Sequence, residues 1–359
     1  MQAKPAAKKV VVALSGGVDS SVAAALLHRQ GVEVIGVTMR LWSEPGCEQE
    51  NRCCTPETRL LAQRLCHHLG IPFHVLDASE VFRSHVVQAF LDGYAAGSTP
   101  NPCIACNQFI KWGYLHTFAG TLSADTIATG HYARLITAPD GKIELWKGVD
   151  AGKDQSYFLS TLSQSQLKST LFPLGEYTKE QVRKMAHEWG LPAADLPESQ
   201  DLCFLGHGDY RTFLRKYAPE VVAPGKVIDR GGIVVGEHEG LAFYTIGQRK
   251  GLPASTHAMY VLAKHVSSNT LVVGPAEALG SKQLFTGQVS WISGDPPSKP
   301  LSVQVKIRYK AAPADAVLTP LAEGGARVHL DKPLRDITPG QMAVFYQGEK
   351  LLGGGVIRQ

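Results

Sequence analysis

Short apolar runs alternate with longer segments of helical periodicity along the first half of the chain. The strands predicted from this pattern fall at 10–14, 32–38, 73–77 and 125–130, and the helices at 55–69 and 80–96. Strands that alternate with helices form parallel sheets covered by helices. The region from Val10 to about Trp189 therefore predicts a doubly wound α/β domain, whose ligands bind at the carboxyl ends of its strands.

After about Leu205, short alternating runs separated by glycine and proline replace the helices. The strands predicted here lie at 259–262, 270–273, 303–309, 326–330 and 343–346. Short strands at close intervals are typical of a small barrel. With 359 residues the chain is too long for one ordinary core. We therefore expect a catalytic domain over 1–204, a central domain over 205–282 and a C-terminal β-barrel over 283–359.

One junction between a predicted strand and a predicted helix carries a glycine turn with hydroxyl side chains. The strand at 10–14 runs into Ser15-Gly16-Gly17-Val18-Asp19-Ser20-Ser21, and a helix-forming stretch follows. A helix N-terminus presents unpaired amides, and glycines let an anion approach the backbone closely. The lysine of a Walker loop is missing. The junction therefore predicts a phosphate-binding loop of another class.

The composition is that of a globular protein with a mild positive charge. The formal net charge is +4, and 44% of the residues are hydrophobic. No apolar run approaches the roughly 20 residues that span a bilayer, and the N-terminal segment lacks the apolar region of a signal peptide. These features predict a cytoplasmic protein without membrane contact. The charge permits RNA binding without requiring it.

Three of the seven cysteines lie in segments of irregular predicted structure. Two prolines precede the pair Cys103 and Cys106, and a sequence pattern typical of a helix resumes at about Asn107. Cys106 would then lie near a helix N-terminus, where the dipole favours a thiolate. Cys203 lies in a separate loop-like segment. In a cytoplasmic chain these cysteines could form a redox or sulfur-carrying pair, or they could bind zinc together with a histidine.

A second group of cysteines and histidines also suggests a metal site. It consists of Cys47, Cys53, Cys54, Cys66, His67 and His68. Its spacing fits no standard zinc pattern, and adjacent residues on a helix point in different directions. The sequence leaves the function of this group unassigned.

Six motifs in order along the chain resemble those of the bacterial tRNA-uridine 2-sulfurtransferases (tRNA-specific 2-thiouridylases) of the PP-loop ATP pyrophosphatase superfamily. The motifs are Ser15–Ser21, Thr99–Pro102 with Cys106-Asn107, Ala128–Arg134, Lys153–Phe158, Gly247–Leu252 and Gly353–Gly355. The resemblance spans nearly the whole chain. It implies a PP-loop catalytic domain, a small central domain and a C-terminal β-barrel that contacts tRNA.

The resemblance also implies a reaction and its partners. Such enzymes use ATP and Mg²⁺ to adenylate O2 of the wobble uridine in tRNA for Lys, Glu or Gln, and then replace that oxygen with sulfur from a sulfur-relay protein or cysteine desulfurase. Adenylation converts a poor leaving group into AMP, so that a soft sulfur nucleophile can attack C2. By position, Cys106 matches the nucleophile and Cys203 the persulfide carrier, and the two can form a disulfide. We expect a monomer.

Further site residues follow from the same resemblance. The positions that match ATP contacts are Ala13, Leu14, Ser15, Gly16, Gly17, Val18, Asp19, Ser20, Met39 and Gly130. The positions that match tRNA contacts are Asn101, Pro102, Cys103, His131, Lys153, Asp154, Gln155, Arg308, Tyr309 and Gln341. A flipped base also needs stacking partners. Tyr132, Trp112 and Phe109 are candidates, with core packing as the alternative. Asp19→Ala should stop ATP turnover and leave the fold intact.

Cys103 departs from the family pattern, because the best-known members carry Asp at this position. A thiol is less suited than a carboxylate to act as a base. However, Cys103, Cys106 and Cys203 together could hold a [4Fe–4S] cluster with one open iron site. A persulfide relay and a cluster mechanism use the same residues, so both remain open at this point.

Two other classes of function compete with this interpretation. One is a PP-loop ligase that amidates a small molecule, which would need an ammonia source and no RNA-binding barrel. The other is a non-catalytic module that binds nucleotide or RNA. The β module from about Leu284 and the pair Cys106 and Cys203 argue against the ligase. The intact phosphate loop together with three thiols argues against the passive module.

Overall fold

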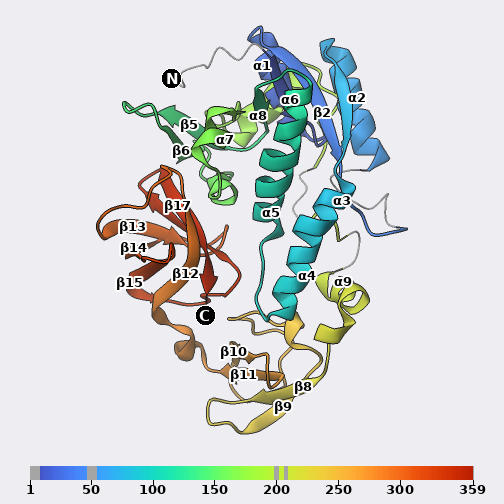
Figure 1. Cartoon of the computed structure of the whole chain (residues 1–359). Coiled ribbons are helices and arrows are strands. Elements are labelled where there is room, and N and C mark those ends of the chain that lie inside the picture. Colours follow the sequence, from blue (N-terminus) through green and yellow to red (C-terminus); the bar gives the residue numbers. More distant parts are fainter. Residues whose placement is uncertain (1–8, 47–54, 198–201, 206–208, 359) are drawn as a thin grey trace.

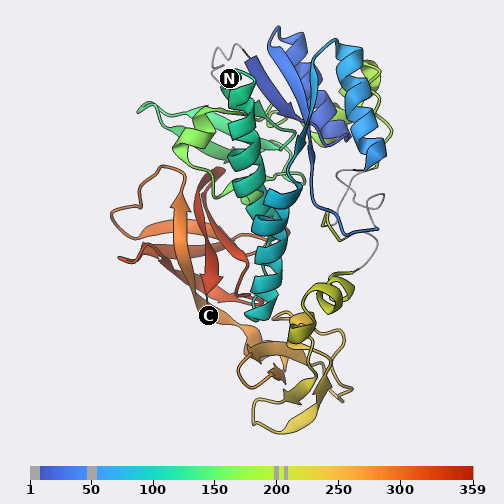
Figure 2. The same ribbon diagram turned by 45° about the vertical axis from the view of Figure 1, so that its right-hand side comes forward.

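The computed structural model describes residues 9–46, 55–197, 202–205 and 209–358. In Figure 1 the N-terminal α/β domain lies at the top and a small β module at the bottom. The C-terminal barrel lies beside the helical column of α4, α5 and α6. The view turned by 45° in Figure 2 shows the same column running between the α/β sheet and the lower module. The helical column therefore joins the other parts of the molecule.

A parallel sheet forms the centre of the α/β domain. Its strands, in spatial order, are β3 (Phe73–Asp77), β2 (Glu33–Arg40), β1 (Lys9–Ala13), β4 (Thr126–Ala128) and β7 (Thr170–Leu171). Val10 and Val12 of β1 are buried in one hydrophobic cluster and Val11 in another. Because successive residues of a strand point to opposite faces, both faces of the sheet are covered. The predicted doubly wound α/β class is therefore confirmed.

The helices of this domain match the predicted positions, with two π-helical interruptions. The helical elements are α1 (Val18–Arg29), α2 (Pro56–Leu69), α3 (Ser79–Phe82), π-helical η1 (Arg83–Val87), α4 (Gln88–Ala95), α5 (Pro102–Ala105), π-helical η2 (Cys106–Leu115), α6 (His116–Thr121), 3₁₀-helical η3 (Ser156–Leu159), α7 (Gln164–Lys168) and α8 (Lys179–Glu188). Thr55 caps α2 by accepting from the amide of Thr58, and Gly70 ends α2 in the left-handed conformation. In the described part of the chain, no helix is both long and apolar enough to cross a membrane.

The helix that carries the cysteine pair begins earlier than predicted. We expected helical structure from about Asn107, but α5 begins at Pro102, and Cys103 is already helical. Proline is well tolerated at the first helical position, and the Asn101 side chain accepts from the amide of Cys103 at 3.2 Å. The prolines therefore initiate this helix rather than delay it.

The C-terminal part is a closed antiparallel barrel, as the short-strand pattern predicts. Its strands are β12 (Ser281–Trp291), β13 (Leu301–Lys306), β14 (Ala314–Pro320), β15 (Ala326–Leu334), β16 (Met342–Gln347) and β17 (Lys350–Arg358). The barrel closes because β12 pairs with both β15 and β17. A hairpin of β5 (Ala133–Thr137) and β6 (Ile143–Lys147) extends this sheet through β17. The sequence did not predict this pairing, which ties the first half of the chain to the barrel.

The central module is a small mixed sheet. Its elements are α9 (Tyr210–Tyr217), η4 (Pro219–Val221), β8 (Gly225–Ile228), β9 (Val234–His238), η5 (Leu241–Phe243), β10 (Tyr260–His265), β11 (Thr270–Gly274) and η6 (Ala276–Leu279). The predicted pair of strands at 259–262 and 270–273 is confirmed as the antiparallel pair β10 and β11. Phe213 of α9 packs edge-on against Phe90 of α4. The module therefore shares a core with the helical column.

The core of the central module contains a lysine. Lys264 is buried, and its ammonium donates to the carbonyl oxygen of Tyr244 at 3.1 Å. Burial lowers the pKa of Lys264 to about 8. Above that pH the folded protein releases the proton while an unfolded lysine still holds it, so that the unfolded state binds more protons and stability rises with pH.

We therefore predict that the free energy of unfolding increases between about pH 8 and pH 10, by up to about 1.4 kcal/mol per pH unit from this group. Urea unfolding followed by circular dichroism measures the slope. Lys264→Met should remove the increase, whereas Lys250→Met, at an exposed position, should retain it. An unchanged slope in the Lys264 variant would show that another group titrates in this range.

Candidate active site

A cavity of about 350 Å³ opens at the carboxyl ends of β1, β2 and β4. One wall comes from the glycine turn and the strand ends. It comprises Ala13, Leu14, Ser15, Asp19, Ser20, Met39 and Gly130. The opposite wall comes from the cysteine-bearing segments. It includes Pro102, Cys103, Cys106, Asn107, Leu202, Cys203 and Phe204. The predicted phosphate-binding loop and all three predicted functional thiols therefore face one space.

The glycine turn has the geometry that a phosphate site needs. Gly16 has φ +77°, and a Cβ on it would lie 2.3 Å from the carbonyl oxygen of Thr58, so only glycine fits. The Ser20 hydroxyl accepts from the amide of Ser15 at 3.2 Å and donates to the carbonyl of Gly17 at 3.1 Å. Gly17 precedes the first turn of α1 and has no side chain to cap its amides. These amides and the helix dipole can therefore bind an anion.

Asp19, in the first turn of α1, joins this loop to two distant elements. Its Oδ1 accepts from the Tyr132 hydroxyl at 2.8 Å and lies 2.6 Å from the ammonium of Lys179 at the start of α8. The Lys179 side chain is 11% exposed and that of Asp19 34%. The carboxylate therefore helps hold α1 and α8 together as well as facing the cavity.

Gly130 allows the end of β4 to approach the loop. A Cβ at this position would lie 2.8 Å from the carbonyl carbon of Asp19 and from the nitrogen of Ser20. Because both contacts are with backbone atoms, a larger residue would push the loop away from the strand. Gly130 follows β4 and Met39 lies near the end of β2, on the two strands that flank β1, and both residues line the cavity.

The three cysteines reach the cavity from two segments. Cys103 is exposed, and Cys106 and Cys203 are partly buried. Phe204, beside Cys203, is buried in an aromatic cluster, with ring centroids 5.3 Å from Phe90 and 5.5 Å from Phe213. The packing of Phe204 keeps Cys203 at the cavity wall.

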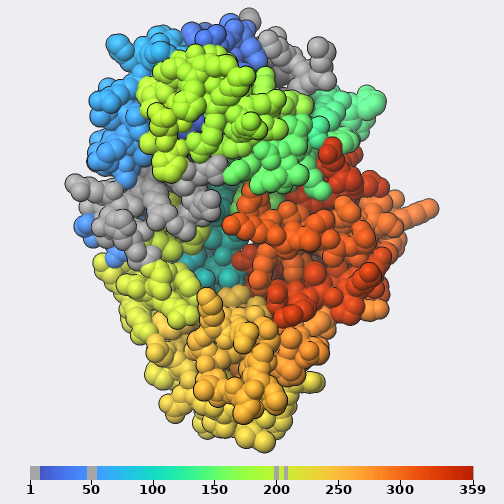
Figure 3. Space-filling model, turned by 180° about the vertical axis from the view of Figure 1, so that it is seen from behind, coloured from blue at the N-terminus to red at the C-terminus, as the bar shows by residue number. Residues whose placement is uncertain are grey.

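The space-filling view in Figure 3 shows the teal helical region at the bottom of a hollow beside the barrel.

The described cysteines form no disulfide. Nor do the described His, Cys, Asp and Glu residues contain any group of three or more that could hold a metal ion. The described residues therefore give no support to the zinc and [4Fe–4S] interpretations of Cys103, Cys106 and Cys203.

The predicted tRNA-contacting residues fall into different environments. Pro102, Cys103, His131 and Gln155 line the cavity. Asn101 lines a larger cavity of about 940 Å³ on the other side of α5, against the barrel.

The segment at 153–155 leads into η3. Asp154 is buried, and its carboxylate accepts from the amides of Gly148 and Ser156. Asp154 therefore stabilises the conformation of its own loop through these hydrogen bonds to the backbone.

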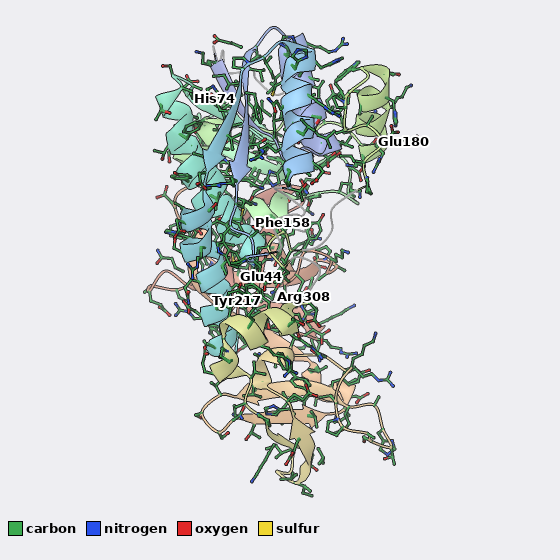
Figure 4. The ribbon with its side chains drawn as sticks, turned by 90° about the vertical axis from the view of Figure 1, so that its right-hand side faces the viewer. Glu44, His74, Phe158, Glu180, Tyr217 and Arg308 are labelled. Carbon is green, nitrogen blue, oxygen red and sulfur yellow. The ribbon has the colours of Figure 1, made fainter. Side chains whose placement is uncertain are left out.

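Arg308 and Gln341 lie where the three parts of the molecule meet. Arg308 donates to the carbonyl of Ile246 in the central module at 3.2 Å and to Thr338 of the barrel at 2.6 Å. Gln341 donates to the carbonyl of Thr99, just before α5, at 2.7 Å. In Figure 4 Arg308 is labelled below Phe158. These side chains thus connect the barrel to the central module and to the segment that precedes the cysteines.

Aromatic side chains also line or border the cavity. Trp112 and Tyr132 are buried, with 2% exposure each, and belong to the core, whereas Phe109 is 40% exposed. Phe158, which the sequence did not single out as a stacking residue, lines the cavity and lies 4.5 Å from Tyr309 between ring centroids. Tyr309 of the barrel therefore reaches the edge of the site through Phe158.

The second cysteine group gains no functional support. Burial raises the pKa of the Cys66 thiol to about 12, which makes it a poor nucleophile. His67 and His68 follow it on α2, as predicted. Cys47, Cys53 and Cys54 lie outside the described residues.

Two lysines of the site were missed at the sequence level. Lys179 reaches Asp19 from 160 positions away along the chain. Lys111 lines the cavity five residues after Cys106, a spacing that would not share a face in an α-helix.

Known proteins match the chain over nearly its full length. Residues 8–207, 211–275 and 281–357 match family models described as tRNA methyl transferase HUP domain, tRNA methyl transferase PRC-barrel domain and Aminomethyltransferase beta-barrel domain. The tRNA-specific 2-thiouridylase MnmA of Magnetococcus marinus is 47% identical over 98% of this chain and 99% of its own length. Proteins of the same name from Chloroflexus aurantiacus and Carboxydothermus hydrogenoformans are 46% and 45% identical, over 97% and 98% of this chain and 98% of each relative.

Proposed function

Because the chain belongs to the tRNA-specific 2-thiouridylases, a family of tRNA sulfurtransferases, we propose that it converts the wobble uridine of tRNA for Lys, Glu or Gln to 2-thiouridine. The observation that carries this proposal is the shared cavity. An anion-binding loop lies across one space from Cys106 and Cys203, which suits a reaction that first activates an oxygen with ATP and then replaces it with sulfur.

ATP binds, on this proposal, with its phosphates on the amides at the start of α1. The adenine lies near Met39 and Gly130, whose strand ends adjoin the loop. Gly16, Gly17 and Val18 form the loop itself. Mg²⁺ enters with the nucleotide, as part of the substrate, and offsets its negative charge.

The first chemical step makes the uridine oxygen a leaving group. O2 attacks the α-phosphorus, the bond from that phosphorus to pyrophosphate breaks, and the proton on N3 passes to solvent. The protein contributes mainly by positioning the reactants and by stabilising the charge on the phosphoryl oxygens. Closure by the barrel and the central module would exclude water that would otherwise hydrolyse the adenylate.

The second step uses two thiols. The terminal sulfur of a persulfide on Cys203 attacks C2, and the C2–O bond breaks to release AMP. The Cys106 thiolate then attacks the sulfur of Cys203. The sulfur–sulfur bond breaks with its electrons on the thiouridine sulfur, N3 regains a proton, and a Cys106–Cys203 disulfide remains for an external thiol to reduce. No step is assigned to an iron–sulfur cluster.

The remaining assignments extend this proposal. The enzyme acts as a cytoplasmic monomer whose sulfur comes from a relay protein or cysteine desulfurase. Its division at about residues 205 and 283 separates the catalytic domain from a central domain and from a C-terminal barrel that contacts tRNA. An amidating ligase is disfavoured because it has no need of the thiols that line the same cavity as the loop, and a passive binding module has no need of them either.

The proposal predicts that purified protein incubated anaerobically with ATP, Mg²⁺, a persulfide donor and tRNA for Lys, Glu or Gln forms 2-thiouridine. Nucleoside mass spectrometry measures the product, and the same tRNA with cytidine at the wobble position is the matched control. Omission of ATP should prevent the reaction. Product that forms without ATP, or at another uridine, would contradict the proposal.

A further inference from the structure

The described part of the cavity wall carries one cation that pairs with no described carboxylate. Lys111 is the only lysine or arginine among the described lining residues, and Asp19 is the only carboxylate. Asp19 already pairs with Lys179. Among the described residues, no carboxylate forms an ion pair with Lys111, so its charge faces the cavity. A polyphosphate that enters this space therefore meets Lys111 as its main side-chain counter-charge.

The π-helical conformation of η2 turns Lys111 toward the cysteine pair. In an α-helix, a residue five positions on is rotated by about 140° from the first. A π-helix bonds residues five apart and reduces this rotation to about 50°. Cys106, Asn107 and Lys111 consequently line the same cavity. Asn107 fixes this face, because its side-chain amide donates to the carbonyl of Phe158 at 2.9 Å.

His131 holds the lysine without neutralising it. The Nε2 of His131 lies 3.4 Å from the ammonium of Lys111, and Nδ1 lies 2.7 Å from the Thr129 hydroxyl. Burial, followed by the charge of Lys111, holds the pKa of His131 well below its usual value. The ring is therefore neutral at physiological pH, and Nε2 accepts from the ammonium. Since a neutral acceptor leaves the positive charge in place, Lys111 is oriented and remains available to an anion.

We infer that Lys111 is a further catalytic residue, which donates hydrogen bonds to the non-bridging oxygens of the α-phosphoryl group while uridine O2 displaces pyrophosphate. This inference rests on the proposed function. The lysine transfers no proton. Because it lines the same cavity as the phosphate loop and Cys106, it can stabilise the transition state of adenylation and then the departing AMP. Such preorganised charge in an enclosed site contributes more than it does in water.

The test separates adenylation from sulfur transfer. Without a sulfur donor, wild-type enzyme should release pyrophosphate from ATP in single turnover, dependent on tRNA. Lys111→Met should slow this release about 100-fold to 1,000-fold, with a parallel loss of 2-thiouridine when sulfur is supplied. Lys111→Arg should recover part of the rate. Lys168→Met, an exposed lysine on α7 away from the cavity, should react like wild type.

Other outcomes are equally informative. If the Lys111→Met variant releases pyrophosphate at the wild-type rate, the inference is wrong. The clearest case would be a variant that loses only thiolation, because Lys111 would then act on Cys106. Wild-type enzyme that releases no tRNA-dependent pyrophosphate would instead refute the proposed function. Circular dichroism and thermal unfolding confirm that each variant is folded, and Lys111→Gln replaces the methionine variant if that one is not.

Discussion

Cys106→Ala is expected to abolish formation of 2-thiouridine in the absence of added thiols, by about 10⁴-fold or more, while tRNA-dependent release of pyrophosphate continues. In the proposed mechanism, adenylation depends on the phosphate loop across the cavity and needs no thiol. Release of the product then depends on a second thiolate that attacks Cys203. Cys106 and Cys203 face the same cavity from separate segments, and Phe204 anchors the second of them.

The variant should stall at a defined covalent species. Without Cys106, a tRNA linked through sulfur to Cys203 should accumulate, and dithiothreitol should release it as 2-thiouridine. Denaturing gel electrophoresis with and without thiol detects the adduct. Cys203→Ala should form neither adduct nor product. Cys66→Ala is the matched control, because Cys66 is buried in the core of α2 with a pKa of about 12. Rapid turnover by the Cys106 variant without thiols would show that Cys106 is not the resolving nucleophile.

The sequence predicted the elements of the fold well where the local signals agreed. The strand at 73–77 and the helix ending before Gly70 match the structure, because a cap, an apolar pattern and a terminating glycine all indicate the same bounds. The hairpin of β5 and β6 was missed. Its partner β17 lies about 200 residues further along, and no local pattern specifies which distant strand completes a sheet.

The candidate site was predicted by position, but its electrostatics were not. The glycine turn and the cysteines stand out as motifs, so their residues could be named from sequence. Lys111 could not, because its place beside Cys106 depends on a π-helical turn that helical periodicity does not reveal. Arg308 and Gln341 were predicted to contact tRNA, and the structure shows hydrogen bonds from both side chains to other parts of the molecule. Such bonds depend on tertiary packing.

Asp19→Ala is expected to stop ATP turnover and also to destabilise the protein, which differs from the sequence-based expectation of an intact fold. The Asp19 carboxylate accepts from Tyr132 and pairs with the largely buried Lys179. Removing it leaves the ammonium without this counter-charge. Breaking a buried pair costs several kcal/mol, and the 34% exposure of Asp19 reduces the expected cost to about 1–3 kcal/mol.

A double-mutant cycle tests this coupling. Lys179→Met in the Asp19→Ala background should recover about 1–2 kcal/mol of the loss, because a methionine needs no counter-charge, and pyrophosphate release should stay absent. Urea unfolding gives the stabilities. Glu188→Ala, which breaks the exposed pair with Lys184, should change stability by less than about 0.5 kcal/mol. If the losses from Asp19→Ala and Lys179→Met simply add, the two side chains do not stabilise each other, and the role of Asp19 is confined to the nucleotide.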